Sequence, residues 1–248
     1  MLELDLVLTG ILIGILAQLV DGTLGMAYGV TSNTFLLTLG LSPTVSSASI
    51  HTAEVFTTLA SGMSHLKIGN VDKRLVKKLV FTGVIFGVLG AYVCATVRSE
   101  ILKPIVSIYL LAIGLIILLR IFKPIEFHIK ERTVPLVGSI AAFLDAVGGG
   151  GWGPIATSTL IAGDHNPRLT VGSVNLAEFF ITVAESTTFL AILGSTHLSL
   201  VVGLVIGGII MAPIGAYICK RIPSRLILIL VGCLIISLSV RTMLLSIV

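Results

Sequence analysis

Four acidic residues recur in this apolar chain at one constant spacing. Asp21 recurs as Asp145 and Glu54 as Glu178, each pair 124 residues apart in a chain of 248 residues. An ionised carboxylate is costly in hydrocarbon, so such a side chain should face a cavity or hold a proton or a cation. We therefore predict that these carboxylates carry a coupling ion, a proton or sodium. In the alternative interpretation, which suits Asp21 and Asp145 best, they cap backbone N–H groups and are structural.

A glycine-rich segment follows Asp145. Residues 148–151 are four consecutive glycines, and Pro154 stands shortly after them. Such a run disfavours a helix, and irregular backbone at membrane depth needs protein, water or a ligand to satisfy it. Because Pro154 suits the first turn of a following helix, exposed N–H groups and a positive helix end would bind an anion there. The predicted anion ligands are the N–H groups of Gly148, Gly149, Gly150 and Gly151. Alternatively, these glycines only permit close packing.

The helices expected after Pro43 and Pro167 carry further polar side chains. Positions 47, 51 and 54 share one helical face, as do the equivalent positions in the second half. Hydroxyl, amide and imidazole groups can donate hydrogen bonds to a small anion. We predict four such ligands, namely Ser49, His51, Ser173 and Asn175.

Two other polar residues receive a weaker interpretation. Glu185 has no acidic equivalent, because Ser61 matches it, so it is a secondary candidate for the site. His65 is expected in a solvated connector.

The amino-acid composition indicates whether the chain folds in water or in a membrane. Hydrophobic residues make up 55% of it, charged residues 11%, and the mean hydropathy is +1.10. Since this leaves too little polar surface for a soluble domain, we expect an all-α polytopic membrane protein in a lipid bilayer. Apolar stretches of near-spanning length agree with this, namely 79–97, 105–119, 198–219 and 226–240. The net charge of +4 comes from short connectors, so no nucleic-acid partner is expected.

The connectors indicate that the two halves have opposite orientations. Connector 67–78 is rich in Lys and Arg, whereas its equivalent, 194–197, has neither. One helix later the asymmetry reverses, because 98–103 is weakly basic and 220–225 is strongly basic. Basic loops stay in the cytoplasm, so we expect two inverted repeats of about five hydrophobic segments each, as in many secondary transporters. The expected division is 1–121, a cytoplasmic linker at 122–133, and 134–248, with the amino terminus outside.

Two segments in each half are short. In the second half they are 134–147 and 154–162, with equivalents near 10–23 and 30–39. A helix of about 14 residues spans about 21 Å, against a hydrocarbon core of about 30 Å. We expect broken or re-entrant helices at the glycine-rich loops. Tilted spans, which would give about ten crossings, are the alternative.

The chain resembles the TauE/SafE family of sulfite exporters. The resemblance rests on the duplicated halves, the segment Asp145–Pro154, the turns at Pro43 and Pro167, and the Ser/Asn/Glu helices. The resemblance covers essentially the whole length. It implies an ion-coupled carrier in the bacterial cytoplasmic membrane for small sulfur-containing anions such as sulfite, sulfonates or sulfoacetate. A passive anion channel would use the same anion-binding backbone, so it remains an alternative.

An intramembrane enzyme is the other alternative. His51 and Glu54 lie three residues apart on one helix, but no HExxH or GxSxG motif accompanies them. We therefore expect no enzymatic activity, no cofactor and no metal site.

Overall fold

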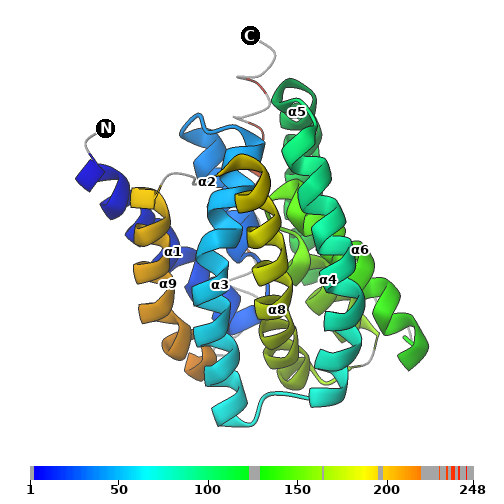
Figure 1. The fold of residues 1–248 in the computed structure, drawn as a ribbon. Helices are drawn as coiled ribbons and strands as arrows, with labels where there is room; N and C mark the ends of the chain where they lie inside the picture. Colours follow the sequence, from blue (N-terminus) through cyan, green and yellow to red (C-terminus); the bar gives the residue numbers. More distant parts are fainter. Residues whose placement is uncertain are drawn as a thin grey trace.

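The computed structural model describes residues 3–122, 129–163, 165–194 and 198–218, with six single residues beyond them at 229, 233, 236, 237, 240 and 244. All regular structure in these residues is helical (Figure 1). The first half contains α1 (Glu3–Leu24), α2 (Tyr28–Thr38), α3 (Pro43–Ile68), α4 (Lys73–Thr96) and α5 (Ser99–Phe122). The second contains η1 (Glu131–Thr133), α6 (Val134–Gly148), the π-helical turn η2 (Gly153–Thr157), α7 (Ser158–Ala162), α8 (Pro167–Leu193) and α9 (Leu198–Ile218).

Four of the described helices, α1, α4, α8 and α9, are long and apolar enough to cross a membrane. Large apolar side chains such as Leu12, Phe81 and Ile210 are exposed on their outer faces. So much exposed apolar surface is unfavourable in water and favourable against lipid. The predicted all-α polytopic membrane protein is confirmed at this level.

The helix boundaries repeat with the spacing of the carboxylates. α1 ends at Leu24 and α6 at Gly148, and α3 begins at Pro43 and α8 at Pro167, so both boundaries recur after 124 residues. The reason is local chemistry, because each long helix has Pro at its first turn after a capping residue. The cap of α3 is Ser42, whose Oγ accepts from the Val45 N–H at 3.3 Å. The cap of α8 is Asn166, whose Oδ1 accepts from the Leu169 N–H at 3.1 Å.

Helix contacts recur between equivalent helices of the two halves. α1 packs against α9, and its equivalent α6 packs against α4, which is the equivalent of α9. The equivalent helices α3 and α8 pack against each other in the middle of the bundle (Figure 1). This arrangement places the central contact between α3 and α8.

Helices α3 and α8 run antiparallel. Ser61 of α3 contacts Asn175 near the beginning of α8, with 2.6 Å between Oγ and Oδ1. Nine residues earlier on α3, Thr52 contacts Ser186 towards the end of α8, with 3.2 Å between the hydroxyl oxygens. Equivalent helices of the two halves therefore point in opposite directions at the centre.

Both halves contain a break followed by a short helical segment. α2 has 11 residues, and η2 with α7 covers residues 153–162, so each spans only about 15–17 Å. Neither can cross a hydrocarbon core of about 30 Å by itself. The segment before the first break is longer than expected, because α1 begins at Glu3 and has 22 residues.

Several sequence predictions lie partly or wholly outside the described residues. They concern half of the linker 122–133, most of the uncharged loop 194–197, the basic connector 220–225 and the greater part of the last apolar stretch.

Candidate functional site

The two chain breaks cross each other in direct backbone contact. A Cβ on Gly29 would meet the Cα of Gly150, and a Cβ on Gly150 would meet the backbone of Val30. Side chains secure the crossing from both halves, because Asn33 Nδ2 donates to the Gly148 carbonyl and Thr157 Oγ1 donates to the Gly25 carbonyl at 2.5 Å. The glycines thus allow the close packing that the alternative interpretation of the run described.

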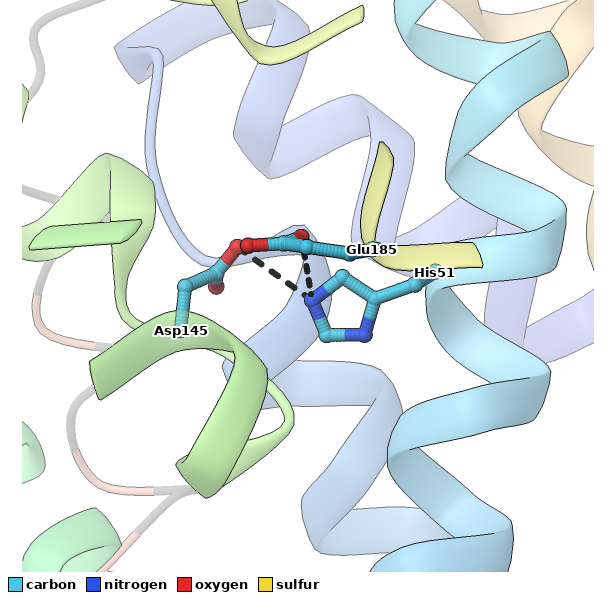
Figure 2. A group of neighbouring side chains, drawn as sticks. All are labelled: His51, Asp145 and Glu185. Carbon is cyan, nitrogen blue, oxygen red and sulfur yellow. Dashed lines mark hydrogen bonds and ion pairs between the residues drawn. The ribbon is translucent and has the colours of Figure 1, made fainter. Parts of the chain in front are cut away.

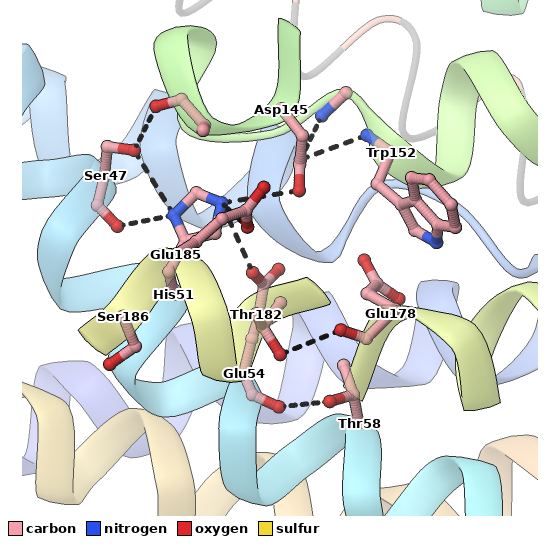
Figure 3. A network of polar contacts seen from close by, with 12 residues as sticks. Ser47, His51, Glu54, Thr58, Asp145, Trp152, Glu178, Thr182, Glu185 and Ser186 are labelled. Atoms are coloured by element: carbon pink, nitrogen blue, oxygen red, sulfur yellow. Dashed lines mark hydrogen bonds and ion pairs between the residues drawn. The ribbon is translucent and has the colours of Figure 1, made fainter. Parts of the chain in front are cut away.

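Asp145 accepts the N–H groups of the glycine run. Its Oδ1 accepts from the N–H of Gly151 at 2.7 Å and from the N–H of Trp152 at 3.0 Å (Figure 3). Its backbone carbonyl accepts from Gly149 and, at 3.1 Å, from Gly150. Since these N–H groups are engaged within the segment, their predicted role as anion ligands stays a prediction that requires another conformation.

The first half repeats this cap. Asp21 lies near the end of α1 and accepts a backbone hydrogen bond from Tyr28, the equivalent of Trp152. Both breaks are therefore closed by a carboxylate from the preceding helix, as expected if Asp21 and Asp145 cap backbone N–H groups.

His51 of α3 bridges the two halves. Its Nδ1 lies 2.7 Å from the Ser47 carbonyl oxygen, so Nδ1 carries the hydrogen of that bond. Its Nε2 lies 3.1 Å from Glu185 Oε2 and 3.3 Å from Asp145 Oδ2 (Figure 2). Because two hydrogen-bond acceptors do not face each other at such a distance, a proton lies between this nitrogen and a carboxyl oxygen.

A second group of three carboxylates lies beside His51. One carboxylate oxygen each of Glu54, Asp145 and Glu178 lie within 4.8 Å of one another, and so do an imidazole nitrogen of His51 and one oxygen each of Asp145 and Glu185. The two triads therefore share Asp145 (Figure 3). Glu54 is 1% exposed, and neither of its oxygens accepts a hydrogen bond from any residue that the structure describes. Glu178 Oε2 also lacks such a donor.

The electrostatics of this cluster are strongly negative. Five carboxylates are buried, at Asp21, Glu54, Asp145, Glu178 and Glu185, with His51 as their basic neighbour. No Lys or Arg is buried in the part of the chain that the structure describes. Uncompensated charge is expensive at low dielectric, so the cluster must take up protons or cations. An anion would be repelled until that happens.

The other predicted ligands are engaged elsewhere. Ser49 Oγ donates to the Val45 carbonyl within its own helix at 2.8 Å. Ser173 Oγ accepts from the Asp72 N–H at 2.7 Å, at the turn between α3 and α4. Asn175 pairs with Ser61 across the α3–α8 contact. The structure thus joins His51 to the carboxylates and separates it from these three residues.

Two residues differ from their sequence interpretation. Glu185 was a secondary candidate, yet it makes the shorter of the two carboxylate contacts to His51. Its spacing of seven residues from Glu178, two helical turns on the same face of α8, was a signal that pointed to the cluster. The prediction of a solvated His65 is wrong, because this residue lies in α3, is fully buried and contacts Asn70.

Comparison with known proteins assigns the chain to a family. The family model described as "Sulfite exporter TauE/SafE" matches residues 10–242. The chain belongs to the sulfite exporter TauE/SafE family. A relative from Bacillus subtilis (strain 168), "Probable membrane transporter protein YtnM", is 44% identical over 241 residues, covering 93% of this chain and 80% of the relative. No solved structure matches the chain.

This membership confirms the resemblance that the sequence motifs indicated. It makes the chain a multi-pass membrane transporter of the TauE/SafE family, in agreement with its spanning helices. It is also consistent with the expectation that the chain is not an enzyme.

Proposed function

We propose that this TauE/SafE protein is a secondary transporter that moves a small sulfur-containing anion, of the sulfite, sulfonate or sulfoacetate type, by ion-coupled alternating access in the bacterial cytoplasmic membrane. The observation that carries the proposal is the buried cluster of five carboxylates and His51 between the halves. Intramembrane carboxylates of this kind mark ion pathways in transporters. The family description, which names sulfite, supports a sulfur-containing anion as the substrate.

The proposed scaffold is an inverted repeat. The antiparallel contact of α3 with α8 and the exchanged contacts of α1, α4, α6 and α9 support it. In transporters with this construction, the substrate and the coupling ion bind where the repeats meet, at broken helices. Here the two breaks and the carboxylate cluster lie at that junction.

Coupling between the ion and the anion follows from the negative charge of the carboxylate cluster. The ionised carboxylates repel an anion, so a coupling ion, a proton or sodium, must reach the cluster before or with the substrate. We propose that the anion then uses N–H groups of Gly148 to Gly151 in a conformation in which Asp145 no longer occupies them. The coupling ion and the anion would thereby depend on the same carboxylate.

The test is transport by the purified protein in proteoliposomes. Uptake of labelled sulfite and sulfoacetate is measured under imposed proton or sodium gradients in the parent protein, in Glu178→Gln and in Glu100→Gln. Glu100 is the matched control, because its side chain is 75% exposed and lies at the start of α5. The parent and Glu100→Gln should accumulate the anion against its gradient. The rate of this coupled uptake should be at least about tenfold lower in Glu178→Gln.

Two results would contradict the proposal. Undiminished uphill uptake by Glu178→Gln would remove the cluster from the coupling mechanism. Strictly downhill flux by the parent under every gradient would identify a passive anion channel instead.

A further inference from the structure

The two triads that share Asp145 differ in their charge balance. In the triad of His51, Asp145 and Glu185, the imidazole Nε2 lies 3.1 Å from Glu185 Oε2 and 3.3 Å from Asp145 Oδ2. In the triad of Glu54, Asp145 and Glu178, the shared Asp145 lies 3.3 Å from His51 Nε2, and Glu54 Oε2 lies 4.0 Å from the same nitrogen. The first triad therefore includes a basic side chain among its three members, whereas the second consists of carboxylates alone.

We propose that Glu54, Asp145 and Glu178 form a binding site for a small hard metal cation, with sodium as the first probe. This inference deepens the proposed function, because it names the coupling ion as a metal cation bound by this triad. The site itself, however, can be tested without any anion substrate.

The ligand atoms have the chemistry and spacing that such a cation needs. All three are carboxylate oxygens, the type that hard cations prefer over nitrogen or sulfur. Oxygens no more than 4.8 Å apart can surround one ion, because oxygen ligands lie about 2.3–2.6 Å from a cation such as calcium. The three ligands come from α3, α6 and α8, so the ion would join both halves.

The unpartnered oxygens are the independent observation for a ligand. Glu54 is 1% exposed and Glu178 4% exposed, so water is largely excluded from both. Neither oxygen of Glu54, nor Oε2 of Glu178, accepts a hydrogen bond from the described residues. Buried polar atoms are normally satisfied, and the Glu54 carboxylate lies with those of Asp145 and Glu178 (Figure 3). A bound cation would satisfy these oxygens together.

The shared ligand is held in place by groups outside the triad. Oδ1 of Asp145 accepts from the N–H groups of Gly151 and Trp152, while its Oδ2 faces His51. Such outer contacts orient a metal ligand and raise the affinity of its site. They also connect the site to Trp152, the only tryptophan of the chain.

Trp152 therefore supplies a direct readout of binding. The purified protein is titrated with sodium chloride against choline chloride at constant ionic strength, and calcium chloride is titrated separately. Binding is followed by Trp152 fluorescence and by calorimetry. We expect a saturable sodium response in the parent protein. Because loss of an outer-shell contact already lowers metal affinity about 10- to 100-fold, loss of a ligand in Glu54→Gln or Glu178→Gln should weaken binding by at least about tenfold.

Two further variants distinguish the triads and test the fold. Glu100→Gln makes the same change at the surface and should bind sodium as the parent does. Glu185→Gln removes a carboxylate from the other triad, so its loss of affinity should be smaller than that of Glu54→Gln. A monodisperse gel-filtration peak and an unchanged circular dichroism spectrum show that each variant is folded, and Glu54→Asp should partly restore affinity if Glu54→Gln loses it.

The outcomes separate this inference from the proposed function. The absence of a saturable response to sodium and calcium in the folded parent, or unchanged affinity in both triad variants, would overturn the site. A response to calcium alone would retain the site and assign it to a divalent cation. Sodium binding without any anion transport would retain the site and reject the proposed substrate class, whereas uphill transport driven by protons without cation binding would do the opposite.

Discussion

Gly150 is the residue at which the two chain breaks touch, and its replacement by alanine tests this crossing. Its φ of +146° lies in the region that favours glycine, and a Cβ there would meet backbone atoms of Gly29 and Val30. Backbone atoms at the start of α2 cannot move aside as the end of a flexible side chain can. Gly150→Ala therefore carries two costs, a strained backbone and an overlap with packed atoms.

Gly40 allows these two costs to be separated. Its φ is +94°, but no atom lies within 4 Å of the position that a Cβ would take. Gly40→Ala should therefore cost only the backbone strain, about 1–3 kcal/mol. Gly150→Ala should cost about 1–3 kcal/mol more, the usual range for overpacking. For a chain of this size, that difference corresponds to roughly 2–12 °C in Tm.

The assay is thermal unfolding of both variants and the parent in one detergent. Trp152 fluorescence follows the break directly, since this side chain is fully buried and its Nε1 donates to the Val174 carbonyl at 3.1 Å. Circular dichroism at a helical wavelength gives a second measure that does not depend on the neighbourhood of residue 150. If Gly150→Ala melts at the same temperature as Gly40→Ala, the breaks do not cross as described.

The remaining stability predictions concern two polar pairs. Ser61→Ala and Asn175→Leu should show a coupling of about 0.5–1.5 kcal/mol in a double-mutant cycle, because their hydrogen bond joins α3 to α8; a cycle that closes at zero would contradict this contact. Lys78 donates to Glu131 at 2.6 Å and holds the pKa of Glu131 below its usual value, so the pair favours folding above that pKa and loses its effect as the pH falls through it. Because the Glu131 side chain is 87% exposed, salt should screen the pair. Glu131→Gln should therefore have the Tm of the parent at low pH and a slightly lower Tm at pH 7. A larger Tm difference at low pH than at pH 7 would show that the predicted direction of the pH dependence is wrong.

Much of the fold follows from patterns that are local or periodic. Pro43 and Pro167 with their capping residues determine where two long helices begin, and the glycine positions mark where α1 and α6 end. A repeat with a constant spacing also reveals which positions are equivalent. These features depend on neighbours in the sequence, so one chain suffices to predict them.

The contacts between the halves could not be predicted in this way. His51 faces Asp145 and Glu185, which lie 94 and 134 residues away in the chain. Internal similarity indicates that residues occupy equivalent positions, but not which residues meet across the contact. The local contact of Asp145 was foreseen only by the alternative in which it caps backbone N–H groups: it accepts the N–H groups of Gly151 and Trp152, which the anion hypothesis had left for a ligand.

Two equivalent contacts lie between α3 and α8 at the centre of the bundle, and their side chains differ in chemistry. His51 and Glu185 meet across α3 and α8, and their repeat equivalents, Asn175 and Ser61, meet across the same helices. The first contact joins an imidazole to a carboxylate, and the second is a neutral hydrogen bond. Because the backbone arrangement is shared, the difference comes from the side chains alone. Ionisable groups are thus concentrated at one of the two equivalent contacts, and we infer that this asymmetry gives the two similar halves different roles.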